Sequence, residues 1–185
     1  MSKIGVDELY YAPLTKDDST GVTYGAPVRI YGLITANIQP AANSATLYAD
    51  NGPVASASAL GAITVSLDTK DLPLADQATL LGHTVTAGQM TSKLSDTAPY
   101  VAIMFKSQKG SGGTVYKKYL KVRFSEPQDN NATKGENVNF QTPTITGNAV
   151  ARTYDGEWKR EADTEATEYE ATTGTNWFTS VEPGA

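Results

Sequence analysis

Side chains that catalyse reactions or bind transition metals are scarce in this sequence. It has no cysteine and one histidine, His83, so thiolate metal sites, disulfides and histidine-dependent triads lack their essential groups. Acidic residues from Glu157 to Glu170 could form an acid–base pair, but nothing apolar around them would raise a carboxylate pKa. We expect this run to be a charged surface, and the sequence predicts no catalytic activity, no metal and no cofactor.

Three short motifs resemble ligand-binding loops only in part. Residues 109–113 read KGSGG, without the GK[ST] ending and the strand-to-helix setting of a phosphate-binding loop. The acidic turns at 50–52 (DNG) and 68–71 (DTKD) lack the alternating ligands of a calcium loop. All three are expected to be turns or helix caps.

Charged residues are unevenly distributed along the chain. The net charge is -5, basic residues gather within 106–134, acids gather within 155–170, and Asp50 is the only charged residue between Gln39 and Leu67. One face of a predicted strand carries Lys117, Tyr119, Lys121 and Arg123. Such a face can bind nucleic acid, but the negative net charge favours a solubilising surface or pairing with the acidic tail.

Size and hydropathy indicate one soluble domain. A chain of 185 residues is long enough to bury a sizeable core. The opening MSKIGVDELYY has one early lysine but no apolar run behind it, and no stretch approaches the ~20 apolar residues that cross a bilayer. We expect a protein made in a cytoplasm, with no membrane partner.

Most of the chain alternates apolar and polar residues with the period of β-strands. Within 28–39, one face carries Val28, Ile30, Ile34, Ala36 and Ile38. Within 63–68, the apolar face carries Ile63, Val65 and Leu67. Residues 100–124 are expected to form a long hairpin, and residues 137–150, which include Pro143, a strand at an edge or bulge.

One helix is predicted, over about 72–81. Asp71 or Leu72 can cap it, Pro73 suits its first turn, and Gly82 can end it in a left-handed conformation. Its buried stripe would be Leu74, Ala78 and Leu81. His83, directly after the helix, is expected to be solvated or to cap it.

The segment 40–60 is unusual for a connection between two strands. It is longer than the ~12–15 residues at which unstructured loops become rare, it is rich in Ala and Ser, and Asn51-Gly52-Pro53 interrupts it. We expect a long loop of small residues, which allow two backbones to approach closely. A flexible surface loop is the alternative interpretation.

Several segments together resemble the major tail proteins of phages with long non-contractile tails. They are GVDELYYAPLTKD (5–17), TLYADNGPVASASALGAITVSLDTKDLPLADQATLLGH (46–83), APYVAIMF (98–105) and KVRFSEPQDNNATKGENVNFQTPTITGNAV (121–150). The resemblance implies a tail-tube fold: mainly β, a β-sandwich of two sheets with one flanking helix. It further implies hexameric rings that stack into a tube, in which a long loop reaches the neighbouring ring.

This resemblance places the chain in the virion, synthesised in the host bacterial cytoplasm, as one domain over 1–185. That domain would have an N-terminal arm over about 1–20 and an acidic C-terminal segment over about 154–185. The sequence TNWFTSV near its end leads us to expect that Trp177, Phe178 and Val181 dock on the body. Implied partners are other copies of the chain, the tape-measure protein and DNA inside the bore without specific binding, and the tail terminator and tail-tip proteins.

Two sets of candidate site residues follow from the resemblance. The ring-stacking loop would use Thr46, Leu47, Tyr48, Asp50, Asn51 and Val54. If the strands beside the loop line the bore, their outward side chains are Thr35, Asn37, Gln39, Thr64, Ser66 and Asp68. A rival hypothesis is a monomeric β-sandwich that binds carbohydrate or a cell-surface polymer, with a stacking platform drawn from Tyr10, Tyr11, Tyr48 and Trp158.

Overall fold

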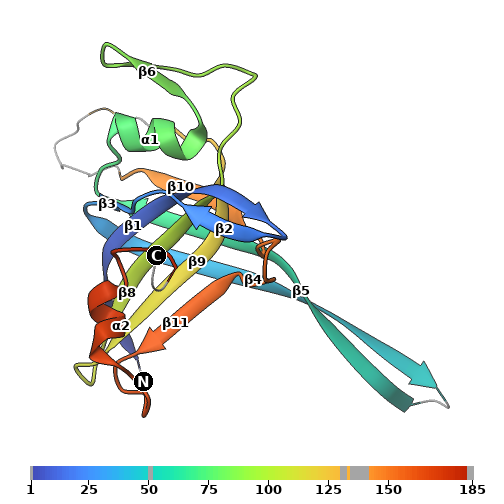
Figure 1. The fold of residues 1–185 in the computed structure, drawn as a ribbon. Coiled ribbons are helices and arrows are strands. Elements are labelled where there is room, and N and C mark those ends of the chain that lie inside the picture. Colours follow the sequence, from blue (N-terminus) through green and yellow to red (C-terminus); the bar gives the residue numbers. More distant parts are fainter. Residues whose placement is uncertain (1, 50–51, 130–132, 134–141, 183–185) are drawn as a thin grey trace.

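The computed structural model describes residues 2–49, 52–129, 133 and 142–182, most of them in a single large sheet (Figure 1). The strands are β1 (Lys3–Asp18), β2 (Gly21–Tyr24), β3 (Val28–Ile30), β4 (Leu33–Ala49), β5 (Gly52–Thr69), β6 (Thr84–Thr86), β7 (Gln89–Thr91), β8 (Val101–Lys109), β9 (Thr114–Phe124), β10 (Thr144–Ala149) and β11 (Lys159–Asp163). The helices are α1 (Leu74–Leu81) and α2 (Ala171–Asn176). The predicted mainly β fold with a flanking helix is confirmed. Neither described helix is long and apolar enough to cross a membrane.

Among the described residues, nine strands join in one sheet and two form a small second sheet. The large sheet follows the order β2-β1-β8-β9-β10-β5-β4, with β3 paired to β1 and β11 paired to β9. The small sheet is the β6–β7 hairpin, which projects beyond α1 (Figure 1).

The N-terminal residues are part of this sheet and not a separate arm. β1 pairs with β8 on one side and with β2 and β3 on the other. Its Leu9 and Tyr11 are buried in the main core. The described residues of the segment predicted as an arm therefore provide both backbone pairing and core side chains.

The large sheet curls until its two ends share one core. β3 lies at one end and β4 at the other, and only Tyr31 and Gly32 separate them in the chain. Buried residues of β1, β5, β8, β9 and β10 belong to a single cluster, which Leu80 and Leu81 of α1 join. The inward positions Ile63, Val65 and Leu67 were predicted correctly. The two layers around the core are the two halves of one curled sheet.

The outer face of β1, β8 and β9 is covered by the C-terminal segment. Successive strand residues point to opposite faces, and Ala102, Met104 and Leu120 form a second buried cluster with Val181, apart from the main core. Phe178 stacks on Tyr10 with ring centroids 4.8 Å apart. The predicted docking of the C-terminal aromatic residues is confirmed, and it leaves only part of the outer face bare.

The predicted helix is present as α1, but its start and its buried side differ from the prediction. Pro73 occupies the N-cap position, and no side chain caps the helix, so the proposed caps at 71 and 72 are wrong. Leu74 is 39% exposed, and the buried residues are Ala78, Leu80 and Leu81. Gly82 ends the helix at φ 78°, as predicted, and a Cβ there would lie 2.4 Å from the Thr97 carbonyl oxygen.

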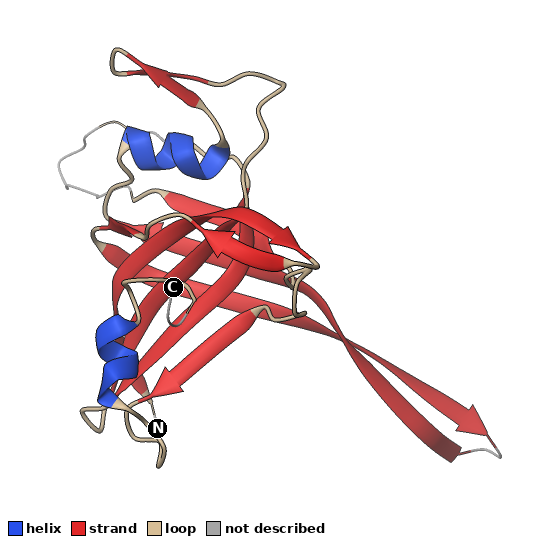
Figure 2. Ribbon diagram, in the orientation of Figure 1, coloured by secondary structure: helices blue, strands red, loops and turns tan. Residues whose placement is uncertain are grey.

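The segment 40–60 is not an irregular loop. β4 and β5 pair along their whole length, from Leu33 opposite Thr69 to Ala49 opposite Gly52. Beyond Pro40 this hairpin leaves the body as a two-stranded projection (Figure 2). We call residues 40–49 and 52–60 the ribbon. Alanine, serine and asparagine are weak strand formers, so the sequence of the ribbon shows little strand character.

Candidate functional site

The six predicted bore residues form three directly opposed pairs on β4 and β5. The pairs are Thr35 with Asp68, Asn37 with Ser66, and Gln39 with Thr64. All point away from the main core, to which the intervening Ala36, Ile38, Val65 and Leu67 contribute. The pleat of the two strands therefore gathers these six side chains on one outer surface.

β10 adds a third column of side chains to this surface, and the sequence pattern did not predict that column. Thr144, Thr146 and Asn148 lie opposite Asp68, Ser66 and Thr64, and all three are exposed. The alternation within 144–149 could have identified these outward residues, since the alternate residues Ile145 and Ala149 are buried. We call these nine side chains of β4, β5 and β10 the polar face.

Asp68 is the only ionisable residue of the polar face, and it is held by two hydroxyls. The Thr144 hydroxyl donates to one carboxylate oxygen at 2.5 Å, and the Thr35 hydroxyl donates to the other. Hydrogen bonds from Thr144 and then Thr35 lower the Asp68 pKa below its ordinary value, because they stabilise the charged form. The polar face is thus neutral except for one fixed negative charge per chain.

The neighbouring strand, β9, brings one cation to the border of the polar face. Arg123 lies opposite Asn148 and is exposed, with its guanidinium 4.0 Å from the centre of the Tyr100 ring. The predicted basic strand face is otherwise not continuous. The β8–β9 register shifts between Val101 and Ile103, Tyr119 is buried in the main core, and Lys121 forms an ion pair with Asp17 at 2.6 Å.

The ribbon extends the same two strands beyond the body. Thr46 lies opposite Ser56, and Ser44 lies opposite Ser58. All four are exposed, and Leu60, where the ribbon leaves the body, is 54% exposed. Of the other predicted stacking residues, Leu47, Tyr48 and Val54 lie in the strands of the ribbon, whereas Asp50 and Asn51 lie outside the described residues.

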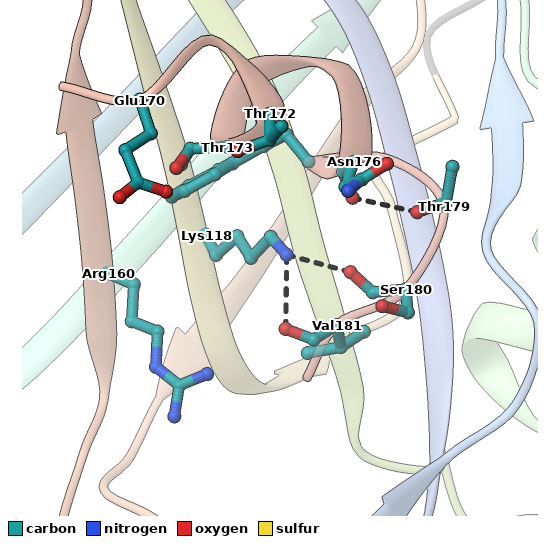
Figure 3. Close-up of a pocket in the computed structure, with 10 residues that line it drawn as sticks. Lys118, Arg160, Glu170, Thr172, Thr173, Asn176, Thr179, Ser180 and Val181 are labelled. Carbon is teal, nitrogen blue, oxygen red and sulfur yellow. Dashed lines mark hydrogen bonds between the residues drawn. The ribbon is translucent and has the colours of Figure 1, made fainter. Parts of the chain in front are cut away.

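A cavity of about 600 Å³ lies beneath the C-terminal segment, between α2 and the strands β9 and β11 (Figure 3). Lys118, only 5% exposed, enters it from β9 and donates hydrogen bonds to the carbonyl oxygens of Ser180, at 2.7 Å, and Val181, at 3.0 Å. Its ammonium also lies 4.6 Å from the centre of the Trp177 ring. Arg160, on the cavity wall, hydrogen-bonds Glu182 at 3.0 Å. These cations fasten the C-terminal segment to the sheet.

The buried position of Lys118 predicts a pH-dependent stability. Burial lowers its pKa to about 8, whereas an unfolded lysine titrates near about 10.4. Between these values the unfolded chain binds more protons, so stability rises with pH. Lys118→Met should reduce the increase in the urea midpoint between pH 8 and 10. Lys117, whose pKa burial also lowers to about 8, still contributes to the pH dependence of this variant. An increase in the urea midpoint equal to that of the natural chain would contradict the assignment to Lys118.

Three residues proposed for the alternative carbohydrate platform, Tyr10, Tyr11 and Trp158, do not lie together on the surface. Tyr11 is buried and donates its hydroxyl to Asp76 at 2.9 Å. Tyr10 is stacked on Phe178, and Trp158 packs against the main core beside Tyr119. Nothing in their placement forms a stacking surface for a sugar ring.

Comparison with known protein families agrees with the resemblance seen in the sequence. No curated protein matches the chain. A family model described as phage tail tube protein matches residues 14–182 of the 185-residue chain, which include the polar face, the ribbon and the C-terminal segment. The match covers nearly the whole chain, and the protein therefore belongs to the phage tail tube family, as a structural component of the phage tail that assembles into a tube.

Proposed function

We propose that this chain is the major tail protein of a phage with a long non-contractile tail, where hexameric rings stack into the tube that conducts DNA during ejection. The observation that carries the proposal is the bare polar face beside an exposed ribbon. A monomer gains little from either feature. A tube needs both a smooth inner wall and a joint between rings.

The polar face is suited to line the bore. Fixed cations would bind DNA phosphates through salt-dependent contacts and slow its passage. Hydroxyl and amide groups offer no such charge, and the Asp68 carboxylate repels phosphate. DNA and the tape-measure protein would therefore pass this surface without specific binding. Arg123 lies at the border of the polar face, and its guanidinium contacts the Tyr100 ring. This contact keeps the cation from lying unpaired on the face.

The ribbon is suited to join one ring to the next. An isolated two-stranded hairpin is at best marginally stable in water, and the outer edge of β4 has no partner strand among the described residues. Its nearly uncharged surface does not repel an identical copy. Six weak contacts between two rings act together, so the joint becomes firm through multivalency.

In this proposal the chain has no catalytic role. The subunit is synthesised in the host bacterial cytoplasm and assembles into the virion, where terminator and tail-tip proteins cap the two ends of the tube. Negative-stain microscopy of the purified protein tests the proposal. Rings or rods support it, whereas a strictly monomeric protein that binds polysaccharide would support the carbohydrate-binding alternative.

The bore assignment predicts a gain of DNA binding by one substitution. Ser66→Lys places a cation in the middle of the polar face, so assembled tubes should bind a short DNA duplex at low salt and shield it from nuclease. Ser111→Lys, in the exposed β8–β9 turn, is the matched control, and its tubes should leave bound DNA open to digestion. Equal nuclease sensitivity in the two variants would exclude the polar face from the bore.

A further inference from the structure

Four side chains form a ladder of stacked π-systems on the outer face near β3. Phe178 stacks on Tyr10 at 4.8 Å between ring centroids. The Arg29 guanidinium lies 5.8 Å from the Tyr10 ring centre and 4.7 Å from that of Tyr31. The ladder begins under the C-terminal segment and ends at Tyr31, which is 71% exposed.

Arg29 has no hydrogen-bond acceptor among the residues that the structure describes. A guanidinium carries five N–H donors, and among the described residues the contacts of Arg29 are with the rings of Tyr10 and Tyr31. Its Nε is shielded from solvent and has no hydrogen-bond partner there. Buried donors in folded proteins are almost always paired. Arg29 as a whole is only partly buried, so its terminal N–H groups can donate to an acceptor from outside the subunit.

The strand that carries Arg29 is also incompletely paired. Within the described part of the chain, β3 pairs with β1 alone, so one of its backbone edges can accept a further strand. β3 is at the base of β4, and the ribbon tip is at the other end. At about 3.3 Å per residue the 17 residues of β4 span about 50 Å. The outer part of a subunit's ribbon therefore cannot reach its own Arg29.

We propose that Arg29, Tyr31 and the open edge of β3 receive the ribbon of a neighbouring copy. This inference rests on the proposed assembly into a tube and names the second half of its joint. Repeated head-to-tail assembly requires two different surfaces on each copy, and the ribbon and the Arg29–Tyr31 surface lie at opposite ends of β4.

The chemistry of the ribbon matches that of the Arg29–Tyr31 surface. The outer edge of the ribbon strand β4 offers backbone carbonyls that no described strand pairs, and these are acceptors for a guanidinium without a carboxylate partner. Its exposed alanine and serine side chains, at 42, 44, 56, 58 and 59, leave a flat surface on which the Tyr31 ring can lie. A large, exposed aromatic residue next to an arginine is the usual composition of an interface hot spot.

Cysteine crosslinking tests the contact directly, because the natural chain contains no cysteine. Tyr31→Cys combined with Ser44→Cys should give a ladder of covalent oligomers when assembled tubes are treated with a short bismaleimide. Tyr154→Cys with Ser44→Cys is the matched control, and it should give none. If the tubes form but position 31 does not crosslink to the ribbon, this inference is overturned and the proposed function stands. If the natural chain forms no tubes, the proposed function is overturned, and the inference that rests on it is overturned with it.

Substitutions measure how much the contact contributes to assembly. Arg29→Met keeps the apolar stem and removes every donor, and Tyr31→Ala removes the exposed ring. Each should raise the protein concentration at which half of the chain sediments as tubes by about tenfold or more. Tyr154→Ala, which truncates another exposed tyrosine, should leave that concentration unchanged. Circular dichroism confirms that each variant is folded, and unchanged assembly by both folded variants would overturn the contact.

Discussion

Shortening the ribbon is expected to abolish tube assembly without unfolding the subunit. Residues 44–58 would be replaced by the dipeptide Asn-Gly. Because Asn43 lies opposite Ala59, a two-residue type I′ turn can close the hairpin there in its natural register. Residues 44–46, 55, 56 and 58 are exposed, and neither buried cluster of the body contains a residue from 44–58 among the described residues. Sedimentation should find the shortened chain entirely in the supernatant at concentrations where the natural chain forms tubes.

Far-UV circular dichroism and a thermal melt provide the fold control for this variant. A matched assembly control inserts Gly-Ser after Gly112, in the exposed turn between β8 and β9, and should assemble normally. Tubes formed by the shortened chain would show that the ribbon is not the ring-to-ring joint. Loss of the subunit fold would show instead that the ribbon belongs to the folding unit.

The second large effect is expected at Arg152, whose side chain is fully buried. It forms ion pairs with Asp155, with Glu157 at 3.1 Å and with Glu182. It also donates a hydrogen bond to the Tyr24 hydroxyl at 3.3 Å. Removing Arg152 breaks all of these contacts at once, and the loss of one partner of a buried ion pair costs about 3–5 kcal/mol. Arg152→Met should therefore lower the unfolding temperature by roughly 6–20 °C.

Arg160→Met is the matched control for this prediction. Arg160 contacts two of the same carboxylates, Glu157 and Glu182, but its side chain is 27% exposed, and partly solvated pairs contribute little. Its substitution should shift the unfolding temperature by a small fraction of the Arg152 effect. Calorimetry at one pH measures both variants. Equal shifts would mean that burial of the Arg152 charge is not what fastens the C-terminal segment.

The core and the helix could be predicted where short-range patterns were strong. Ile63, Val65 and Leu67 alternate without interruption, and all three are buried. The prediction of inward-facing residues failed where the alternation of inward and outward positions is interrupted. Ile34 was expected to face inward, but it is 47% exposed and Leu33 packs against the core instead. The β4–β5 register shifts between Leu33 and Thr35, and a period-two pattern cannot reveal such an irregularity.

Only part of the candidate site could be predicted, because its residues come from strands that are far apart in the sequence. The outward residues of β4 and β5 followed from alternation alone. Their union with Thr144, Thr146 and Asn148 depends on β10 pairing with β5 across about 80 residues of sequence, and no local pattern specifies that pairing. The ribbon was missed as paired strand because its small residues have little strand propensity. The contacts of Arg29 with Tyr10 and of Arg152 with Tyr24 and Glu182 likewise join residues that are distant in the sequence.

The pairing of β1 with β8 also orders events during synthesis. β1 ends at Asp18, and β8 begins at Val101. At roughly 5–20 residues per second, a ribosome takes roughly 4–17 s to make the intervening chain. During that interval β1 lacks its partner β8, whereas both strands of the ribbon, β4 and β5, are completed. Segments around Val181, which cover the outer face, are made after all of these strands. A nascent chain therefore presents its ribbon before its body is complete. In the proposed joint, the surface that receives another copy is finished only after the segment around Val181 has been made.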